Sequence, residues 1–229
     1  MTDVFYKGKR LNEDAPIRVR PCSHVLKHTV HLDKVKAERF LLPISKKKTH
    51  VIEIHAGQIT TTDLTISLPP TLNFEPFGGY SKIAAVERHH NTGKIGVAVA
   101  KGYGIRNGAV ASSVSHDSHN IIVIGDNDAD MAIAVNEIIR TQGGYTVVEN
   151  GKVYETLALP IMGLMSDAGF ENVNEALQRM IKKAHQMGVA AQIDPFVTLS
   201  FLALPVIPEL RITPRGICKM TAKGPAIVS

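Results

Sequence analysis

The sequence predicts an α+β domain with a largely antiparallel sheet and two main helices, preceded by a short β-hairpin segment. Runs of β-branched residues separated by turn residues recur along the chain and indicate strands. Residues 128–141 and 172–187 place apolar side chains at helical spacing. Asn150-Gly151 separates two strand-like runs, and both residues tolerate positive φ, which is typical of a hairpin turn. Hairpins combined with few helices favour an α+β fold over alternating strand–helix units.

The strands are expected in chain order from the N-terminus. Lys7-Gly8-Lys9 predicts a hairpin between residues 4–6 and 10–11. Further strands are expected over 51–54, 60–68, 82–87, 94–100, 121–124, 145–149 and 152–159. The run 121–124 is wholly apolar and indicates a buried strand. Gly102, Gly104 and Gly108 form a flexible stretch, and they match a dinucleotide-binding fingerprint poorly because the third glycine is misplaced.

Both helices have start and stop signals. Residues 125–128 supply turn and N-cap residues before the first helix, and Gly143-Gly144 ends it. The second helix ends at Gly188. Their apolar faces comprise Met131, Val135, Ile138 and Ile139 in the first, and Val173, Leu177, Met180, Ile181 and Ala184 in the second.

Composition is that of an ordinary folded protein, with 229 residues, 44% hydrophobic and 21% charged. No apolar run approaches the roughly 20 residues that cross a bilayer, and no signal peptide is recognisable, so we expect a cytoplasmic protein without a membrane partner. Cys22 and Cys218 lie far apart, and free thiols are favoured over a bridge. The net charge of +5 includes a short lysine run, Lys46-Lys47-Lys48, but tryptophan is absent and aromatics are 5%. We therefore expect no nucleic-acid partner and interpret the lysines as a solvated loop.

The densest polar cluster is His116-Asp117-Ser118-His119-Asn120, immediately before the apolar run at 121. In an extended segment, alternate side chains would face opposite sides; in a turn, Asp117 and Asn120 would bond nearby backbone groups. The residues alone leave function and structure equally open. We expect the cluster in or beside a concave, partly buried polar pocket, because such groups are costly to bury without partners.

Three further groups are weaker candidates. Glu87-Arg88-His89 could orient a polar ligand, although a surface salt bridge is favoured. Asp167 is a candidate site carboxylate, with helix capping the favoured alternative. Three histidines are spaced as metal ligands on a helix would be, but no helix signal surrounds them, and exposed or packing roles are favoured: His24, His28 and His31.

Four strings of the sequence resemble a known family. They are Glu87-Arg88-His89-His90-Asn91-Thr92-Gly93, His116-Asp117-Ser118-His119-Asn120-Ile121, residues 159–167 and residues 194–210. In order and spacing they are similar to the C-terminal region of adenine deaminases, and the likeness covers nearly the whole chain. The resemblance divides the chain into residues 1–45, a remnant of a small β domain with its connection, and residues 46–229, the C-terminal α+β domain.

The family belongs to the metal-dependent amidohydrolases, and the resemblance implies a hydrolase of purine salvage that converts adenine and water to hypoxanthine and ammonia. It also implies a metal-binding barrel domain or subunit as partner, with manganese, iron or zinc, a purine ligand, and a homo-oligomer. In that barrel the metal lowers the pKa of a bound water, which attacks the purine. This chain has no His-x-His pair and no serial strand–helix pattern, so no metal ligand is assigned to it.

Three functions remain open. The chain is a part of a hydrolase that is inactive without its barrel, or a stand-alone purine-binding or regulatory module without catalysis. Least favoured is an independent hydrolase using His116 and His119. As the part nearest the chemistry or a domain interface we single out His116, Asp117, His119 and Asn120, followed by Glu87, Arg88 and His89.

Overall fold

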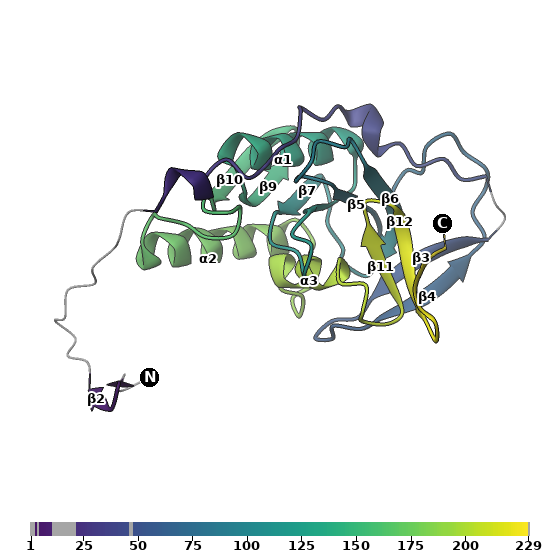
Figure 1. Ribbon diagram of the computed structural model, residues 1–229. Coiled ribbons are helices and arrows are strands. Elements are labelled where there is room, and N and C mark those ends of the chain that lie inside the picture. Colours follow the sequence, from purple (N-terminus) through teal and green to yellow (C-terminus); the bar gives the residue numbers. More distant parts are fainter. Residues whose placement is uncertain (1–2, 4, 11–21, 46–47, 229) are drawn as a thin grey trace.

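The computed structural model describes residues 3, 5–10, 22–45 and 48–228. An eight-stranded sheet forms its centre, in the order β10-β9-β7-β8-β5-β6-β3-β4 (Figure 1). Neighbouring strands are antiparallel, except that β3 pairs in parallel with β6. The strands are β3 (Thr49–Ile54), β4 (Thr61–Ile66), β5 (Tyr80–Val86), β6 (Ile95–Lys101), β7 (Gly108–Ser112), β8 (Ile121–Gly125), β9 (Gly144–Glu149) and β10 (Lys152–Ala158).

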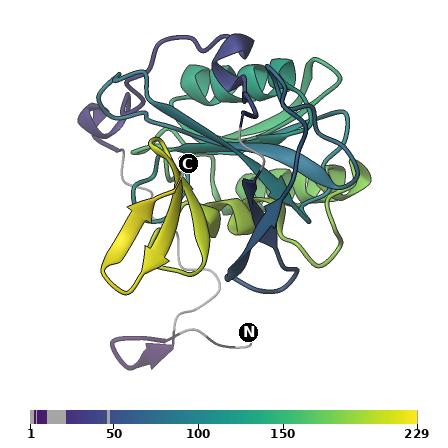
Figure 2. The same ribbon diagram turned by 90° about the vertical axis from the view of Figure 1, so that its right-hand side faces the viewer.

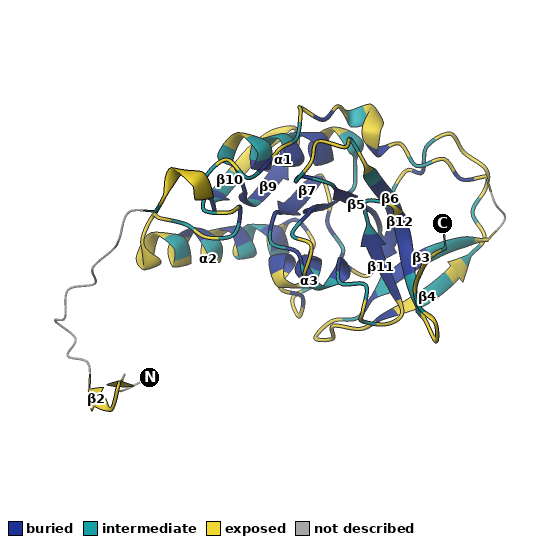
Figure 3. Ribbon diagram, viewed as in Figure 1, coloured by how far each residue is buried: buried dark blue, intermediate teal, exposed yellow. Residues whose placement is uncertain are grey.

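The central strands are mostly apolar because both faces of the sheet are covered. Successive residues of a strand point to opposite faces. In β8, Ile122 and Ile124 join one core cluster, whereas Ile121 and Val123 join the other. Figure 3 shows these buried strands between layers whose outer surfaces are exposed.

Helices cover the two faces of the sheet (Figure 2). α1 (Asp128–Thr141) lies on one face, and the side chain of Asn127 caps its first turn. α2 (Phe170–Gln186) and α3 (Pro195–Leu202) lie on the other. The carboxylate of Asp194 accepts two backbone N–H groups in the first turn of α3, which fixes the start of this short helix.

A second, three-stranded sheet packs against the first near β6. It consists of β11 (Leu210–Thr213), β12 (Gly216–Thr221) and β13 (Gly224–Ile227). A β-carbon at Gly96 would lie 2.1 Å from the carbonyl oxygen of Thr213. Only glycine therefore permits this close approach of the two sheets.

The α+β fold predicted from the sequence is confirmed. Both predicted helices lie within two residues of their expected bounds, and β9 and β10 form the expected hairpin at Asn150-Gly151. The N-terminal hairpin is present as β1 (Phe5–Tyr6) and β2 (Lys9–Arg10), while residues 4 and 11 lie outside the described part of the chain.

Five elements were not predicted: β7, α3 and the three strands of the small sheet. β7 consists of small residues, and this composition has a packing cause at its first residue. A β-carbon at Gly108 would lie 2.0 Å from the carbonyl oxygen of Val148 on the neighbouring strand β9. The strand is buried along its whole length, where larger side chains have no room.

Residues 22–45 run over the face covered by α1. They contain two short 3₁₀ turns, η1 (His24–Leu26) and η2 (Ala37–Phe40), and no strand longer than a single bridge. Val30, Val35 and Phe40 are buried in the core cluster that includes α1. The division of the chain at residue 45 stays a prediction. Within the described residues, no helix is long and apolar enough to span a membrane.

Candidate functional site

One end of the large sheet gathers the loops that contain the candidate residues. Residues 87–94, 113–120 and 159–169 all leave the sheet at this end, which we call the loop end. The register shows it, because the following residues are paired there: Val86 with Ile121, Ser112 with Tyr145, and Ala158 with Gly144. Candidate strings far apart in the sequence are therefore neighbours in space.

The cluster at 116–120 forms a turn rather than an extended segment. The Asn120 amide oxygen accepts the backbone N–H of Arg88 at 3.3 Å, and its amide nitrogen donates to the Ser118 hydroxyl at 3.1 Å. The His89 Nε2 lies 2.7 Å from the carbonyl oxygen of Ser118. Of the two conformations considered from the sequence, the turn is the observed one, but the backbone group that the Asn120 side chain bonds belongs to Arg88, 32 residues away, and not to the turn itself. The turn also joins both candidate strings into one cluster.

Arg88 occupies the centre of the loop end and is 2% exposed. Its Nε donates to the carbonyl of His119, one Nη to the carbonyl of Thr29 at 3.1 Å, and the other to the carbonyl of Met162 at 3.0 Å. Burial lowers the pKa of Arg88. A β-carbon at Gly163 would lie 2.7 Å from the guanidinium, so glycine leaves room for it. The expected surface salt bridge at Arg88 is wrong, because the side chain is interior and bonds carbonyl groups.

The two histidines of the turn are half-buried and lie side by side. Their ring centroids are 6.2 Å apart, and the His116 ring lies 5.1 Å from that of Phe201 in α3. Burial, followed by the charges of Arg88 and His116, lowers the pKa of His119, so its imidazole is neutral at neutral pH. The His119 Nδ1 is buried and has no hydrogen-bond partner among the described residues. Such an atom is costly unless something satisfies it.

Glu87 organises the turn between β5 and β6. Burial raises its pKa, but hydrogen bonds from the backbone N–H groups of Thr92, His89 and His90 and from the Thr92 hydroxyl outweigh that effect and lower it. Glu87 is therefore a charged acceptor for its own loop. Its carboxylate holds His89 in place beside the 116–120 turn.

Asp167 does not join this cluster. Its carboxylate lies 2.6 Å from the Nζ of Lys27, and this hydrogen bond lowers the pKa of Asp167. The capping interpretation is wrong, because Gly169 is the N-cap of α2 and the helix begins one residue later. The Lys27–Asp167 pair instead ties the connection at residue 27 to the loop that precedes α2.

No metal site arises in the described part of the chain. No group of three or more His, Cys, Asp or Glu side chains is close enough to hold an ion there. His24, His28 and His31 are exposed, as favoured from the sequence. The two cysteines are free thiols, with Cys218 buried.

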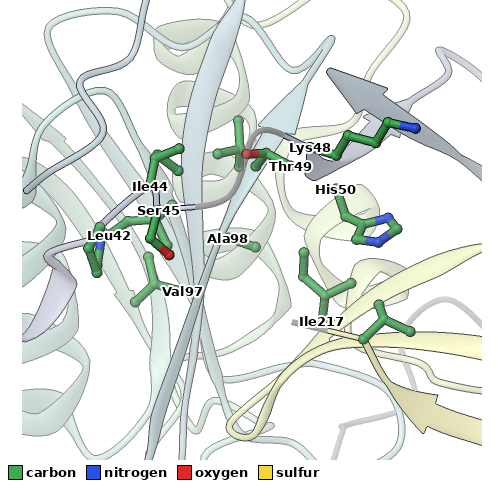
Figure 4. A pocket seen from close by; sticks show the side chains of 12 residues that line it. Leu42, Ile44, Ser45, Lys48, Thr49, His50, Val97, Ala98 and Ile217 are labelled. Carbon is green, nitrogen blue, oxygen red and sulfur yellow. The ribbon is translucent and has the colours of Figure 1, made fainter. Parts of the chain in front are cut away.

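Two cavities of the protein lie at different distances from the 116–120 cluster. One cavity, of about 320 Å³, is lined by residues 42–45 and 48–50, by β6 and by β12 (Figure 4). It lies away from the 116–120 cluster. Another, of about 780 Å³, lies at the loop end between β10 and the start of α2. Asp117 and Ser118 are exposed, while Asn120 is buried and both histidines are half-buried. That the cluster lines a substrate pocket stays a prediction.

Sequence reasoning missed the groups that complete the cluster. The ring of Phe201 packs against that of His116 at a tilt of 45°, and the carbonyl of Ser200 accepts the backbone N–H of His116 at 3.1 Å. The hydroxyl of Ser113 donates to the carbonyl of Gly163 at 2.6 Å. Phe201 and Gly163 lie within strings that resemble the family, but only the fold brings them to the turn.

Comparisons with known proteins match most of this chain. A family model described as the adenine deaminase C-terminal domain matches residues 58–223. The chain is 47% identical over 215 residues to an adenine deaminase of Desulfitobacterium hafniense and 41% identical over 220 residues to one of Nitratidesulfovibrio vulgaris, covering in each case 93% of this chain and 38% of the relative. It is 38% identical over 227 residues to an adenine deaminase of Bacillus subtilis, covering 95% and 39%.

The chain thus spans somewhat over a third of the length of the curated relatives that it matches. The family model covers most of the described domain, including the loop end, α1 to α3 and part of the small sheet. The chain belongs to the adenine deaminase C-terminal domain family.

Proposed function

We propose that this chain works as the C-terminal portion of an adenine deaminase, in the cytoplasmic salvage of purines. The complete enzyme would convert adenine and water to hypoxanthine and ammonia. One observation supports this most directly: the chain matches about 38% of relatives named adenine deaminase, through a domain described as their C-terminal one. About 62% of each relative, the remainder, has no counterpart in this chain.

The catalytic ion belongs, in this proposal, to an amidohydrolase barrel formed by the missing portion. Manganese, iron or zinc bound there would lower the pKa of a water molecule. The described residues offer no ligand set for such an ion, so no step of the reaction is assigned to them. His116 and His119 cannot replace it, because two imidazoles without further ligands make a poor metal site. We further propose that the complete enzyme is a homo-oligomer.

The part proposed for this chain is to bring the loop end to the mouth of the barrel. There His119, neutral at neutral pH, would present the accessible part of its half-buried imidazole, because its Nδ1 is buried within the domain. A neutral imidazole either donates or accepts a hydrogen bond, as purine edges require. Arg88 would act on the site only by positioning, because its donors already bond carbonyl groups.

The isolated chain is expected to be inactive. Purified residues 1–229, supplied with Mn²⁺, Fe²⁺ or Zn²⁺, should release no ammonia from adenine above the uncatalysed rate. The same chain joined to the preceding portion of the Desulfitobacterium hafniense relative should deaminate adenine in the same assay. Turnover by the isolated chain would contradict the proposal. Adenine binding by calorimetry without turnover in either form would instead support a stand-alone purine-binding module.

Removing both imidazoles of the turn tests the role of the loop end. In the joined, active chain, His116→Ala with His119→Ala is expected to lower kcat/KM by about 10-fold, because losing one hydrogen bond to the substrate costs about 1 kcal/mol. His55→Ala with His185→Ala is the matched control, since both side chains are half-buried like those of the turn and lie outside the loop end. Unchanged turnover, KM and unfolding midpoint in the first variant would leave the 116–120 cluster without a role.

A further inference from the structure

Several large apolar side chains are exposed at the loop end and on the segments beside it. We define the loop-end patch as five of them: Val25, Leu26, Met162, Met165 and Phe170. Phe170 is the first residue of α2, and its side chain is 76% exposed. It does not join the apolar face with which this amphipathic helix packs on the sheet. Single exposed apolar residues are normal on a protein surface, but clusters of them mark interaction sites.

A cavity makes the patch concave. Met165 and Phe170 line its rim, and the cavity of about 780 Å³ continues inward between β10 and α2. Its other walls are mainly apolar, and they include Tyr145, Leu157, Leu159, Leu164, Val173 and Leu177. A groove with apolar walls and an apolar rim suits protruding aliphatic or aromatic side chains of a protein partner.

The charges beside the patch are already paired. The ammonium of Lys27 and the carboxylate of Asp167 neutralise each other at 2.6 Å. The guanidinium of Arg88, behind the patch, is buried and bonded to carbonyl groups. A charged ligand would find no free counter-charge among these groups, whereas an apolar protein surface would lose little by covering them.

The path of the chain indicates which protein surface this is. Residues 22–26 lie on the patch, where the carbonyl of Leu26 accepts the N–H of Met162 at 2.7 Å. Lys27 is fixed by its ion pair with Asp167. Thr29 is fixed by the hydrogen bond that its carbonyl accepts from Arg88. Figure 1 shows the segment entering the domain beside the start of α2. A portion joined ahead of residue 1 is therefore connected to the domain beside the patch, through residues 1–21.

We propose that the loop-end patch is the surface on which the preceding portion of an adenine deaminase packs. This inference rests on the proposed function, which places about 62% of the enzyme ahead of the chain, the remainder of the relatives' length. The occupant is a part of that portion that presents aliphatic or aromatic side chains to the cavity. Packing there brings the barrel beside the 116–120 turn, since Arg88 joins Met162 to His119.

Site-specific photo-crosslinking tests this surface in the joined chain described above. Benzoylphenylalanine replaces Met165 in one sample and Phe170 in a second, so that a folding failure in one leaves the other informative. The control places it at Leu72, which is 91% exposed on the connection between β4 and β5. That connection leads into the first residue of β5, at the opposite end of the strand from Glu87.

Illumination at positions 165 and 170 is expected to capture peptides of the preceding portion, and illumination at 72 is not. A mixture of ¹⁵N-labelled and unlabelled protein separates capture within one chain from capture of a second copy. Active enzyme that crosslinks at 165 and 170 only within residues 1–229, or to a second copy, would overturn this inference and leave the proposed function standing. An inactive joined chain with no crosslink to the preceding portion would overturn both.

Discussion

Replacing Arg88 with alanine is expected to lower the free energy of unfolding by about 3 kcal/mol or more, because each buried acceptor left unpaired costs about 1–3 kcal/mol. The side chain donates to the carbonyl groups of Thr29, His119 and Met162. These residues belong to three segments that are far apart in the sequence and meet around Arg88. Their loss should loosen all three segments together. Urea denaturation of the 1–229 chain measures the change through the transition midpoint at constant m-value.

Two variants make the Arg88 result specific. Arg88→Lys keeps the charge but not the planar set of donors, and we expect an intermediate loss. Arg140→Ala is the matched surface control. Arg140 pairs with Glu137 on the exposed side of α1, and such pairs contribute about 0.2–1 kcal/mol. Equal, small losses for Arg88→Ala and Arg140→Ala would contradict the central role given to Arg88.

The elements that could be predicted from the sequence are those with local signals. Asn127 caps α1 within its first turn, and the turn at Asn150-Gly151 sets the register of its own hairpin. Such features depend on a few neighbouring residues, so one sequence is enough to identify them. The alternation of Ile121 to Ile124 between two core clusters likewise follows from strand geometry once both faces are covered.

The missed elements depend on their surroundings instead. α3 is apolar on nearly all sides, and it packs on β7 and β8 beside α2, so it has no amphipathic period to recognise. β7 is made of small residues because its neighbours leave no room. The strands of the small sheet are only four to six residues long, and their pairing with one another is set by tight turns near the C-terminus.

The candidate site divides in the same way. The 116–120 cluster could be identified because it has five consecutive polar side chains. Glu87, Arg88 and His89 could be identified only as a separate candidate. Their meeting could not be predicted, because it requires β5 and β8 to be antiparallel neighbours, with the end of β5 beside the start of β8. The interior position of Arg88 depends on Thr29 and Met162, which are 59 and 74 residues away in the sequence.

A second buried cation lies at the opposite end of β5. Lys82 is 1% exposed, and its Nζ lies 2.5 Å from the carboxylate of Asp128, 2.6 Å from the amide oxygen of Asn73 and 3.2 Å from the carbonyl of Phe40. Burial lowers the pKa of Lys82, while the hydrogen bond and charge of Asp128 oppose that effect. The ammonium of Lys82 therefore joins β5 to the first turn of α1, through Asp128. It also joins β5 to the two segments that cross this end of the sheet, through Phe40 and Asn73.

Replacing Lys82 with alanine is expected to cost about 3–5 kcal/mol, because removing one partner of a buried ion pair leaves the other uncompensated. Calorimetry should show a lower Tm for the 1–229 chain. Lys101→Ala is the control, since Lys101 pairs with Glu53 at 2.9 Å but remains 38% exposed, and its loss should be about 1 kcal/mol or less. The double change Lys82→Met with Asp128→Asn should recover part of the loss, because no unpaired charge then remains. Equal Tm values for Lys82→Ala and Lys101→Ala would show that the buried pair does not join β5 to α1 as described.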